Sequence, residues 1–209
     1  MTPPTRRDRK RQQTLDHIAR TGYALFQAYG FDAVTMEQIA AEADIAKGTL
    51  YKYFPVKEAV LSHWIHAELA QDLAPLLASA ATAGSFAARV ATVLQASVAW
   101  CEAHRGYLAP YLRYRLTGVG QPQPGNHDEP SADLAQAFAA LIARGQADGE
   151  LRHDLSTAQL ALYLHFLYLS ALLRWLDHAR LSLTDEFGDI VTFFLQGAAA
   201  RDPRRAGAA

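Results

Sequence analysis

Residues 47–53 carry side chains whose types and spacing could bind a polyanion. The segment reads Lys-Gly-Thr-Leu-Tyr-Lys-Tyr, so ammonium and hydroxyl groups surround a single leucine. We take it as a helix whose Leu50 faces inward together with Phe54. At about 100° per residue, Gly48 and Lys52 then point outward. A glycine there lets a second backbone approach closely, and a lysine can reach a base edge or a phosphate. The pattern indicates contact with DNA.

Two short helices must position these side chains. Thr35 followed by Gln38 is a capping-box pattern and predicts a helix from 36 to about 43. A second helix is expected at 47–54, after a short turn. The residues that would close a core between the two helices are Ile39, Ala40, Ala43, Ile45, Leu50 and Phe54. This arrangement is typical of a helix-turn-helix, whose second helix lies in the major groove.

Further donors flank the surface that we expect to face the groove. Thr49 can donate to a phosphate or contact a thymine methyl group, and Tyr51 and Tyr53 offer hydroxyl groups near the phosphates. Lys57 falls in the first turn of the next helix, where free backbone N–H groups favour an anion. Thr35 caps its own helix at a similar end. Taken singly, each is more often a packing or surface residue, and the tyrosines could simply cover core edges.

Charge is unevenly distributed along the chain. Twenty Lys and Arg oppose 21 Asp and Glu over 209 residues, for a net charge of −1 at pH 7. Residues 1–60 hold nine basic and seven acidic residues, hence +2, and the remaining eleven and fourteen give −3 over residues 61–209. The asymmetry is small, but it is the pattern of a DNA-binding head on a neutral body.

The first eleven residues are strongly basic. Their five cationic side chains are Arg6, Arg7, Arg9, Lys10 and Arg11. We expect residues 1–11 to form a flexible arm that enters a minor groove, neutralises phosphates or merely solubilises the chain. The sequence does not favour binding over solubilising.

Helical periodicity continues through the rest of the chain and predicts an all-α fold. No alternating apolar run indicates a strand. Further helices are expected at 14–29, ending at a Gly30 cap, and at 56–80, 84–104, 106–117, 131–147, 156–179 and 184–200. We expect a loop at 118–130, a helix-turn-helix domain at 12–58, a C-terminal helical domain at 59–200 and a flexible tail at 201–209.

The composition favours a cytoplasmic protein. Cys101 is the single cysteine, which excludes an intrachain disulfide and suits a reducing compartment. The charged N-terminal segment has no apolar run behind it, unlike a signal peptide. The most apolar stretch, 158–173, includes Tyr163 and His165 and is too short and too polar to span a bilayer.

The segment 31–61 resembles the DNA-binding signature of the TetR family. It carries Thr35, Ile39-Ala40 directly after Met-Glu-Gln, a turn, Gly-Thr-Leu-Tyr, an aromatic-Phe pair and Lys-Glu. The resemblance covers about residues 12–62 and implies a three-helix head on a helical body. It also implies that Thr35, Thr49, Tyr51, Tyr53 and Lys57 contact mainly phosphates, while Lys47, Gly48 and Lys52 face bases.

Two residues depart from the family pattern. Asp44 stands where the turn usually has glycine, and Ala46 replaces a usual serine N-cap. An aspartate tolerates a left-handed backbone less well than glycine, and losing such a cap costs about 1 kcal/mol. We therefore expect a recognition helix that is looser until DNA orders it.

The resemblance further implies that the C-terminal domain dimerises through its last two long helices and encloses a small molecule. Residues 158–176 are apolar almost throughout, so that helix should be buried most of the way round. The final helix offers a matching stripe of Phe187, Ile190, Val191, Phe194 and Leu195. We expect a homodimer through helices 156–179 and 184–200, bound to a pseudo-palindromic double-stranded DNA operator.

A small-molecule pocket should combine aromatic walls with a few polar groups. The residues that fit are Trp64, Trp100, Cys101, His104, Tyr107, Tyr111, Tyr114, His165 and Phe166, with Trp175 as a further aromatic. Each of them is individually more often an ordinary core residue. The aromatic content favours an apolar or aromatic effector.

The leading hypothesis is a repressor that a small apolar or aromatic molecule releases from its operator. An activator or a corepressor-dependent form of the same fold remains open. His63 and His66, like Cys101 and His104, have metal-ligand spacing, but chance explains four such residues better, and we expect no metal and no cofactor. No catalytic motif predicts an enzyme. A helical scaffold that has lost DNA binding is the remaining alternative.

Overall fold

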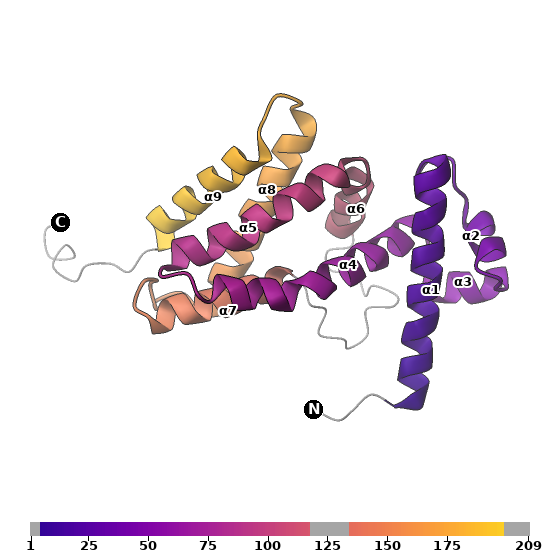
Figure 1. Cartoon of the computed structure of the whole chain (residues 1–209), viewed down its shortest axis with the longest axis horizontal. Coiled ribbons are helices and arrows are strands. Elements are labelled where there is room, and N and C mark those ends of the chain that lie inside the picture. The colour runs from indigo at the N-terminus through magenta and orange to yellow at the C-terminus, as the bar shows by residue number, and fades with distance from the viewer. Residues whose placement is uncertain (1–4, 118–133, 199–209) are drawn as a thin grey trace, which may run out of the picture. The chain divides into compact units, whose positions relative to one another are not determined.

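The computed structural model describes residues 5–117 and 134–198, and its labelled elements are all α-helices (Figure 1). In chain order they are α1 (Arg6–Tyr29), α2 (Met36–Glu42), α3 (Lys47–Tyr53), α4 (Lys57–Ala80), α5 (Phe86–Ala103), α6 (Arg105–Thr117), α7 (Leu134–Ala147), α8 (Thr157–Asp177) and α9 (Leu183–Ala198). The all-α prediction is confirmed. The expected loop at 118–130 and the tail at 201–209 lie outside the described residues. None of the described helices has the length and apolarity needed to cross a membrane.

The chain divides into two compact units. The first runs to Leu69 and takes in α6 from Gly106, and the second holds Ala70–Arg105 together with α7, α8 and α9. The sequence suggested a domain boundary at residue 58, whereas the two units divide inside α4 and α6 belongs with the N-terminal helices. Tyr107 of α6 meets the ring of Tyr23 edge-on at 5.4 Å.

The core of the first unit lies between α1, α2, α3 and the start of α4. Ile18, Phe26, Ile39, Leu50 and Val60 are fully buried there. Gly30 ends α1 with φ +85°, as its sequence position predicts, and its N–H donates to the Phe26 carbonyl. Thr35 and Gln38 form the predicted capping box at the start of α2.

The start of α1 corrects one expectation. We predicted a flexible arm at 1–11, whereas the helix already begins at Arg6. Thr5 and Asp8 supply a second capping box, in which the Thr5 Oγ1 accepts from the Asp8 N–H and the Asp8 carboxylate accepts from the Thr5 N–H. This pattern satisfies donors that would otherwise fray the helix end.

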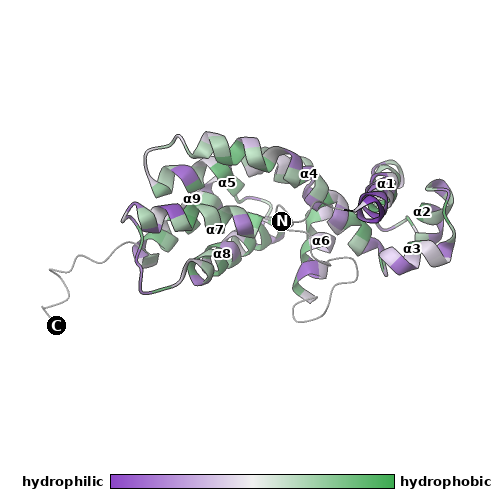
Figure 2. Cartoon of the chain, turned by 90° about the horizontal axis from the view of Figure 1, so that it is seen from below, coloured by the Kyte–Doolittle hydropathy of each residue, from purple (hydrophilic) through white to green (hydrophobic). Residues whose placement is uncertain are grey.

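The second unit packs α7 against α8, α8 against α9, and α5 against both α7 and α9. Figure 2 shows hydrophobic residues predominating along these helices, in contrast to the hydrophilic α1. Arg89 of α5 is 1% exposed and donates to Asp148 Oδ2 at 3.1 Å and to Glu150 Oε1 at 2.6 Å. Glu150 also accepts from the Phe86 N–H. These partly buried ion pairs link α5 to the segment after α7.

Gly22 allows a close contact between α1 and α4 in the first unit. A Cβ at Gly22 would lie 2.7 Å from Val60 Cγ1. We expect Gly22→Ala to lower the free energy of unfolding by about 1–2 kcal/mol, because overpacking outweighs the gain in helix propensity. Thermal unfolding at fixed protein concentration measures the loss. Gly106→Ala is the control, since its Cβ would meet no described atom within 4 Å; an equal loss in both variants would contradict the packing argument.

The ion pairs of Arg89 should contribute more to the free energy of unfolding than a surface ion pair does. Arg89→Met removes both contacts of the buried guanidinium and is expected to cost about 2 kcal/mol in urea unfolding at pH 7, because the remaining Asp148 and Glu150 carboxylates can be hydrated. Arg144 also pairs with Asp148, at 3.5 Å, but its side chain is 52% exposed. Arg144→Met should therefore change the stability by less than about 1 kcal/mol. A similar cost for both substitutions would argue against the buried network.

Candidate nucleic-acid interface

The turn between α2 and α3 has the backbone that its sequence suggested. Asp44 adopts φ +51°, the left-handed conformation in which a glycine is less strained. The Ile45 N–H donates to the Ala40 carbonyl at 3.0 Å, which closes the turn. Ala46 precedes α3 without a side-chain cap, as expected. The helix-turn-helix geometry is thus formed without two of the residues that usually favour it.

One face of α3 is buried and the opposite face is free. Leu50 is fully buried, whereas Gly48, Thr49 and Lys52 are exposed. A Cβ placed on Gly48 would meet no atom of the described chain within 4 Å. Packing inside the protein therefore does not require a glycine here. A second molecule that approaches this face does provide a reason for it.

Glu37 of α2 organises two of the expected DNA contacts, and the sequence reasoning missed it. Its Oε1 accepts from the Tyr51 hydroxyl at 3.4 Å and lies 3.7 Å from Lys47 Nζ. All three side chains are largely exposed. The carboxylate holds a hydroxyl and an ammonium group at the edge of α3. Glu37 lies in the first turn of α2, and no sequence pattern near α3 points to it.

Lys57 and Thr35 have structural partners in addition to any DNA. The Lys57 ammonium donates to the carbonyls of Phe31, Asp32 and Val34 at 2.8–3.2 Å, and it lies 4.6 Å from the centroid of the Phe31 ring. The sequence grouped Lys57 with the phosphate contacts, but these bonds engage all three of its donors. The Thr35 hydroxyl accepts from the Gln38 N–H and keeps its own proton to donate.

The expected pocket residues are divided between the two units. In the first unit, Trp64 stacks on Tyr23 with ring centroids 3.3 Å apart, and Tyr111 donates or accepts a hydrogen bond with His66 at 3.1 Å. Burial raises the pKa of Tyr23 to about 12. Burial also raises the pKa of Tyr114. These side chains, with Tyr107, form part of the packing of α1, α4 and α6.

The other pocket candidates belong to the second unit. Cys101 is buried with its Sγ 3.9 Å from the Tyr168 hydroxyl, and burial raises the pKa of its thiol to about 11. The thiol therefore stays protonated near neutral pH. The His104 ring stacks on Trp100 and bonds to that residue's carbonyl at 2.8 Å. Phe166 is 49% exposed, so its ring does not lie wholly within a core.

The metal-ligand spacings of the sequence have other partners in the structure. His63 Nε2 lies 2.8 Å from Asp16 Oδ1, and His66 faces Tyr111. Cys101 and His104 contact residues of the second unit, as described above. Residues 5–117 and 134–198 contain no group of three or more His, Cys, Asp or Glu arranged to hold a metal ion.

An apolar surface remains open along α8. Leu162, Phe166 and Leu173 are between 43% and 52% exposed. At 100° per residue these three positions fall within about 40° of one another, so they form one stripe. On α9, Phe193 is 68% exposed. Contiguous apolar surface of this kind is typical of a protein–protein interface.

Comparison with known proteins places the helix-turn-helix in a family. Residues 18–63 match the model for bacterial regulatory proteins of the tetR family. Over 60 residues, the chain is 38% identical to a putative mycofactocin biosynthesis transcriptional regulator of Mycobacterium tuberculosis, and the match covers 29% of this chain and 30% of that protein. Over 46 residues it is 44% identical to an uncharacterized HTH-type transcriptional regulator of Bacillus subtilis, covering 22% and 16%. These matches span less than a third of either relative.

Solved structures extend the likeness to the whole fold. FadR of Thermus thermophilus, a TetR-family transcriptional repressor crystallised with lauroyl-CoA, is 24% identical, with a TM-score of 0.73 and coverage of 90% of this chain and 96% of that one. A putative tetR-family regulator from Shewanella sp. PV-4 is 25% identical, with a TM-score of 0.55 and coverage of 90% and 99%. The N-terminal helix-turn-helix and the C-terminal helical domain are thus shared with these proteins. The chain is thus similar to bacterial regulatory proteins of the tetR family over its helix-turn-helix, and it shares its overall fold with solved TetR-family regulators.

Proposed function

We propose that this protein is a homodimeric transcriptional repressor that releases a pseudo-palindromic operator when a small molecule binds its C-terminal domain. The observation that carries the proposal is the free face of α3, where Gly48 and Lys52 stand exposed opposite the buried Leu50. A helix held from one side only can enter a major groove with its other side.

Each group near α3 has a role in this proposal. Gly48 allows the backbone to approach the bases, and Lys52 and Lys47 reach base edges. Phosphate contacts come from the hydroxyls of Thr35, Thr49, Tyr51 and Tyr53. Lys57 acts as a positioning residue, because its bonds to three carbonyls hold the segment between α1 and α2. The Glu37 carboxylate keeps Tyr51 and Lys47 at the rim before DNA arrives.

The exposed stripe on α8 supports dimerisation. A second copy that covers Leu162, Phe166 and Leu173 by a two-fold axis would bury the same stripe twice. The two recognition helices would then meet half-sites about one turn of DNA apart or more. Phe193 of α9 adds to the proposed interface.

The effector is proposed to act through the helices common to both units. α4 and α6 each contribute residues to both. A ligand that prefers one conformation of the second unit would shift these helices, in proportion to its differential affinity for the two states. We propose an effector with an apolar or aromatic part. Because the Thermus protein was crystallised with lauroyl-CoA, fatty acyl-CoA thioesters are the first probes to test.

Gly48→Ala separates stability from DNA binding. The added Cβ points into open space and improves helix propensity, so the free energy of unfolding should stay unchanged or rise by up to about 1 kcal/mol. The same Cβ should weaken binding to duplex DNA about tenfold or more, as measured by fluorescence anisotropy. Lys52→Gln should also weaken binding, whereas Arg20→Gln, which removes one exposed charge from α1, serves as the control. Equal affinities for all three variants and the parent would refute the assignment of α3.

Phe166→Glu tests the proposed dimer. Because the ring is about half exposed in the single chain, the substitution should leave the fold intact but place two carboxylates in the dimer interface. Sedimentation velocity should show monomers, and binding to a two-half-site duplex should fall more steeply than binding to one half-site. Phe166→Leu keeps the stripe apolar and should remain dimeric. A dimeric Phe166→Glu protein would exclude this part of α8 as the interface.

A further inference from the structure

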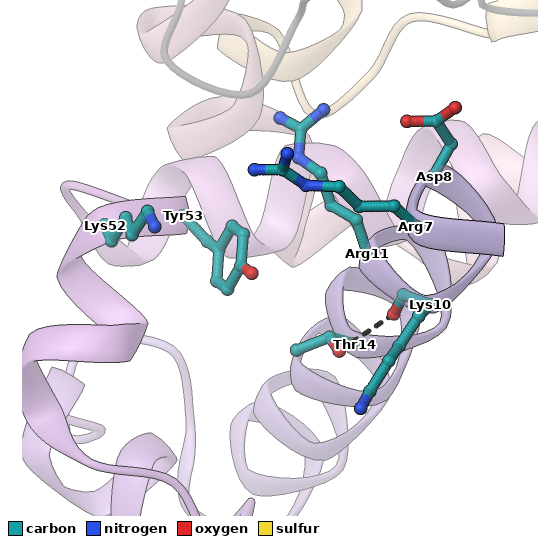
Figure 3. A pocket seen from close by; sticks show the side chains of 7 residues that line it. All are labelled: Arg7, Asp8, Lys10, Arg11, Thr14, Lys52 and Tyr53. Atoms are coloured by element: carbon teal, nitrogen blue, oxygen red, sulfur yellow. Dashed lines mark hydrogen bonds between the residues drawn. The ribbon is translucent and has the colours of Figure 1, made fainter. Parts of the chain in front are cut away.

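A basic groove lies between the first turns of α1 and the end of α3. It encloses about 320 Å³ and is lined by Arg7, Asp8, Lys10, Arg11, Thr14, Lys52 and Tyr53. In Figure 3 the guanidinium groups of Arg7 and Arg11 extend from α1 toward the side where Tyr53 and Lys52 lie. Cationic side chains more than 40 positions apart in the sequence therefore line one hollow.

The α1 residues of this groove share one face of the helix. Arg7, Lys10, Arg11 and Thr14 follow the i, i+3, i+4, i+7 spacing, so they lie along one stripe. Arg6 and Arg9 belong to the same turns but do not line the groove. The helix therefore divides the basic residues into a group that lines the groove and a group outside it. A flexible arm would not separate them in this way.

The single carboxylate of the groove is already engaged. Asp8 accepts from the Thr5 N–H at 3.0 Å and from the Thr5 hydroxyl at 2.6 Å. These hydrogen bonds hold the pKa of Asp8 below its ordinary value. In Figure 3 its carboxylate lies apart from the guanidinium groups. Arg7 and Arg11 also interact electrostatically with Asp8, so four cations and the Tyr53 hydroxyl line the hollow against a single carboxylate.

We propose that this groove binds the sugar-phosphate backbone of duplex DNA next to the base pairs that α3 contacts. Phosphates suit it because Arg and Lys bind their oxygens through charge-assisted hydrogen bonds, and the Tyr53 hydroxyl adds a donor. Lys52 and Tyr53 belong to α3 and also line the groove. One DNA strand can therefore run from the α3 surface into the groove. The inference rests on the proposed DNA-binding function.

Helix dimensions decide between the backbone and a minor groove. An α-helix with side chains is about 10–12 Å across, whereas the minor groove of B-DNA is about 6 Å wide. The start of α1 cannot enter that groove while it remains helical, and its capping box keeps it so. Contacts from this segment should therefore add affinity without reading sequence.

The test compares two double substitutions of equal charge in the full-length protein. Arg7→Gln with Arg11→Gln removes two groove cations, and Arg6→Gln with Arg9→Gln removes two cations of the same helical turns outside the groove. Glutamine keeps a helix propensity close to that of arginine, and circular dichroism checks this. The affinity for a fluorescein-labelled duplex of mixed sequence is measured from about 50 to 300 mM salt, and the sequence preference by selection from a random duplex pool.

We expect the groove pair to lower the magnitude of the log–log salt slope by about 2 and to weaken binding roughly tenfold or more near 150 mM salt. The outer pair should change the slope by less than about 0.5, and neither pair should change the selected sequence. Equal effects of both pairs would overturn the proposal in favour of diffuse attraction. Loss of a flanking A·T preference in the groove pair would overturn it in favour of minor-groove reading. If the parent protein itself shows no salt-dependent DNA binding, the proposed function fails together with the groove.

Discussion

The close packing of α1 onto α2 and α4 at Gly22 is the contact on which the recognition surface depends. Without a side chain at Gly22, Val60 and Ile39 reach the α1 backbone, and these elements share one small core. Leu50 then fills the same core from α3. Lys57 adds a polar constraint from the start of α4, because its ammonium satisfies three carbonyls of the segment that leads into α2. The direction of α3 follows from these contacts, not from its own short helix.

A recognition helix held this way can be intrinsically weak. Asp44 has a left-handed backbone, Ala46 offers no cap, and Gly48 lowers helix propensity. Each of these features costs stability, yet Leu50 and the closing bond of Ile45 keep the segment in place. The lost stability is concentrated on the exposed side of the helix-turn-helix. Such a distribution is expected where binding to a second molecule, and not packing in the core, determines which residues are present.

Local patterns predicted those parts of the structure that depend on a few neighbouring residues. Examples are the capping box at Thr35, the cap at Gly30 and the helix pattern. The sequence predicted them because each depends on residues within one or two helical turns. The Thr5–Asp8 box was equally local, but the density of charge around it suggested a flexible arm instead. The bonds of Lys57, the position of Glu37 and the packing of α6 with the first unit join distant segments, so no window of sequence contained them. The division of the pocket candidates between the two units was not predictable for the same reason, because residue type alone does not place a side chain.

Near-neutral charge is compatible with DNA binding because three carboxylates of the first unit are locally engaged. Asp8 caps α1, Asp16 faces His63, and Glu37 pairs with Lys47 and Tyr51. A carboxylate with short-range partners contributes less to the field a few ångströms away than its formal charge implies, and salt screens the remainder within about 10 Å. The groove-lining cations of α1 and α3 are therefore felt by a nearby phosphate more strongly than the sum over residues 1–60 suggests. It is the placement of charge, and not its net value, that suits this surface to a polyanion.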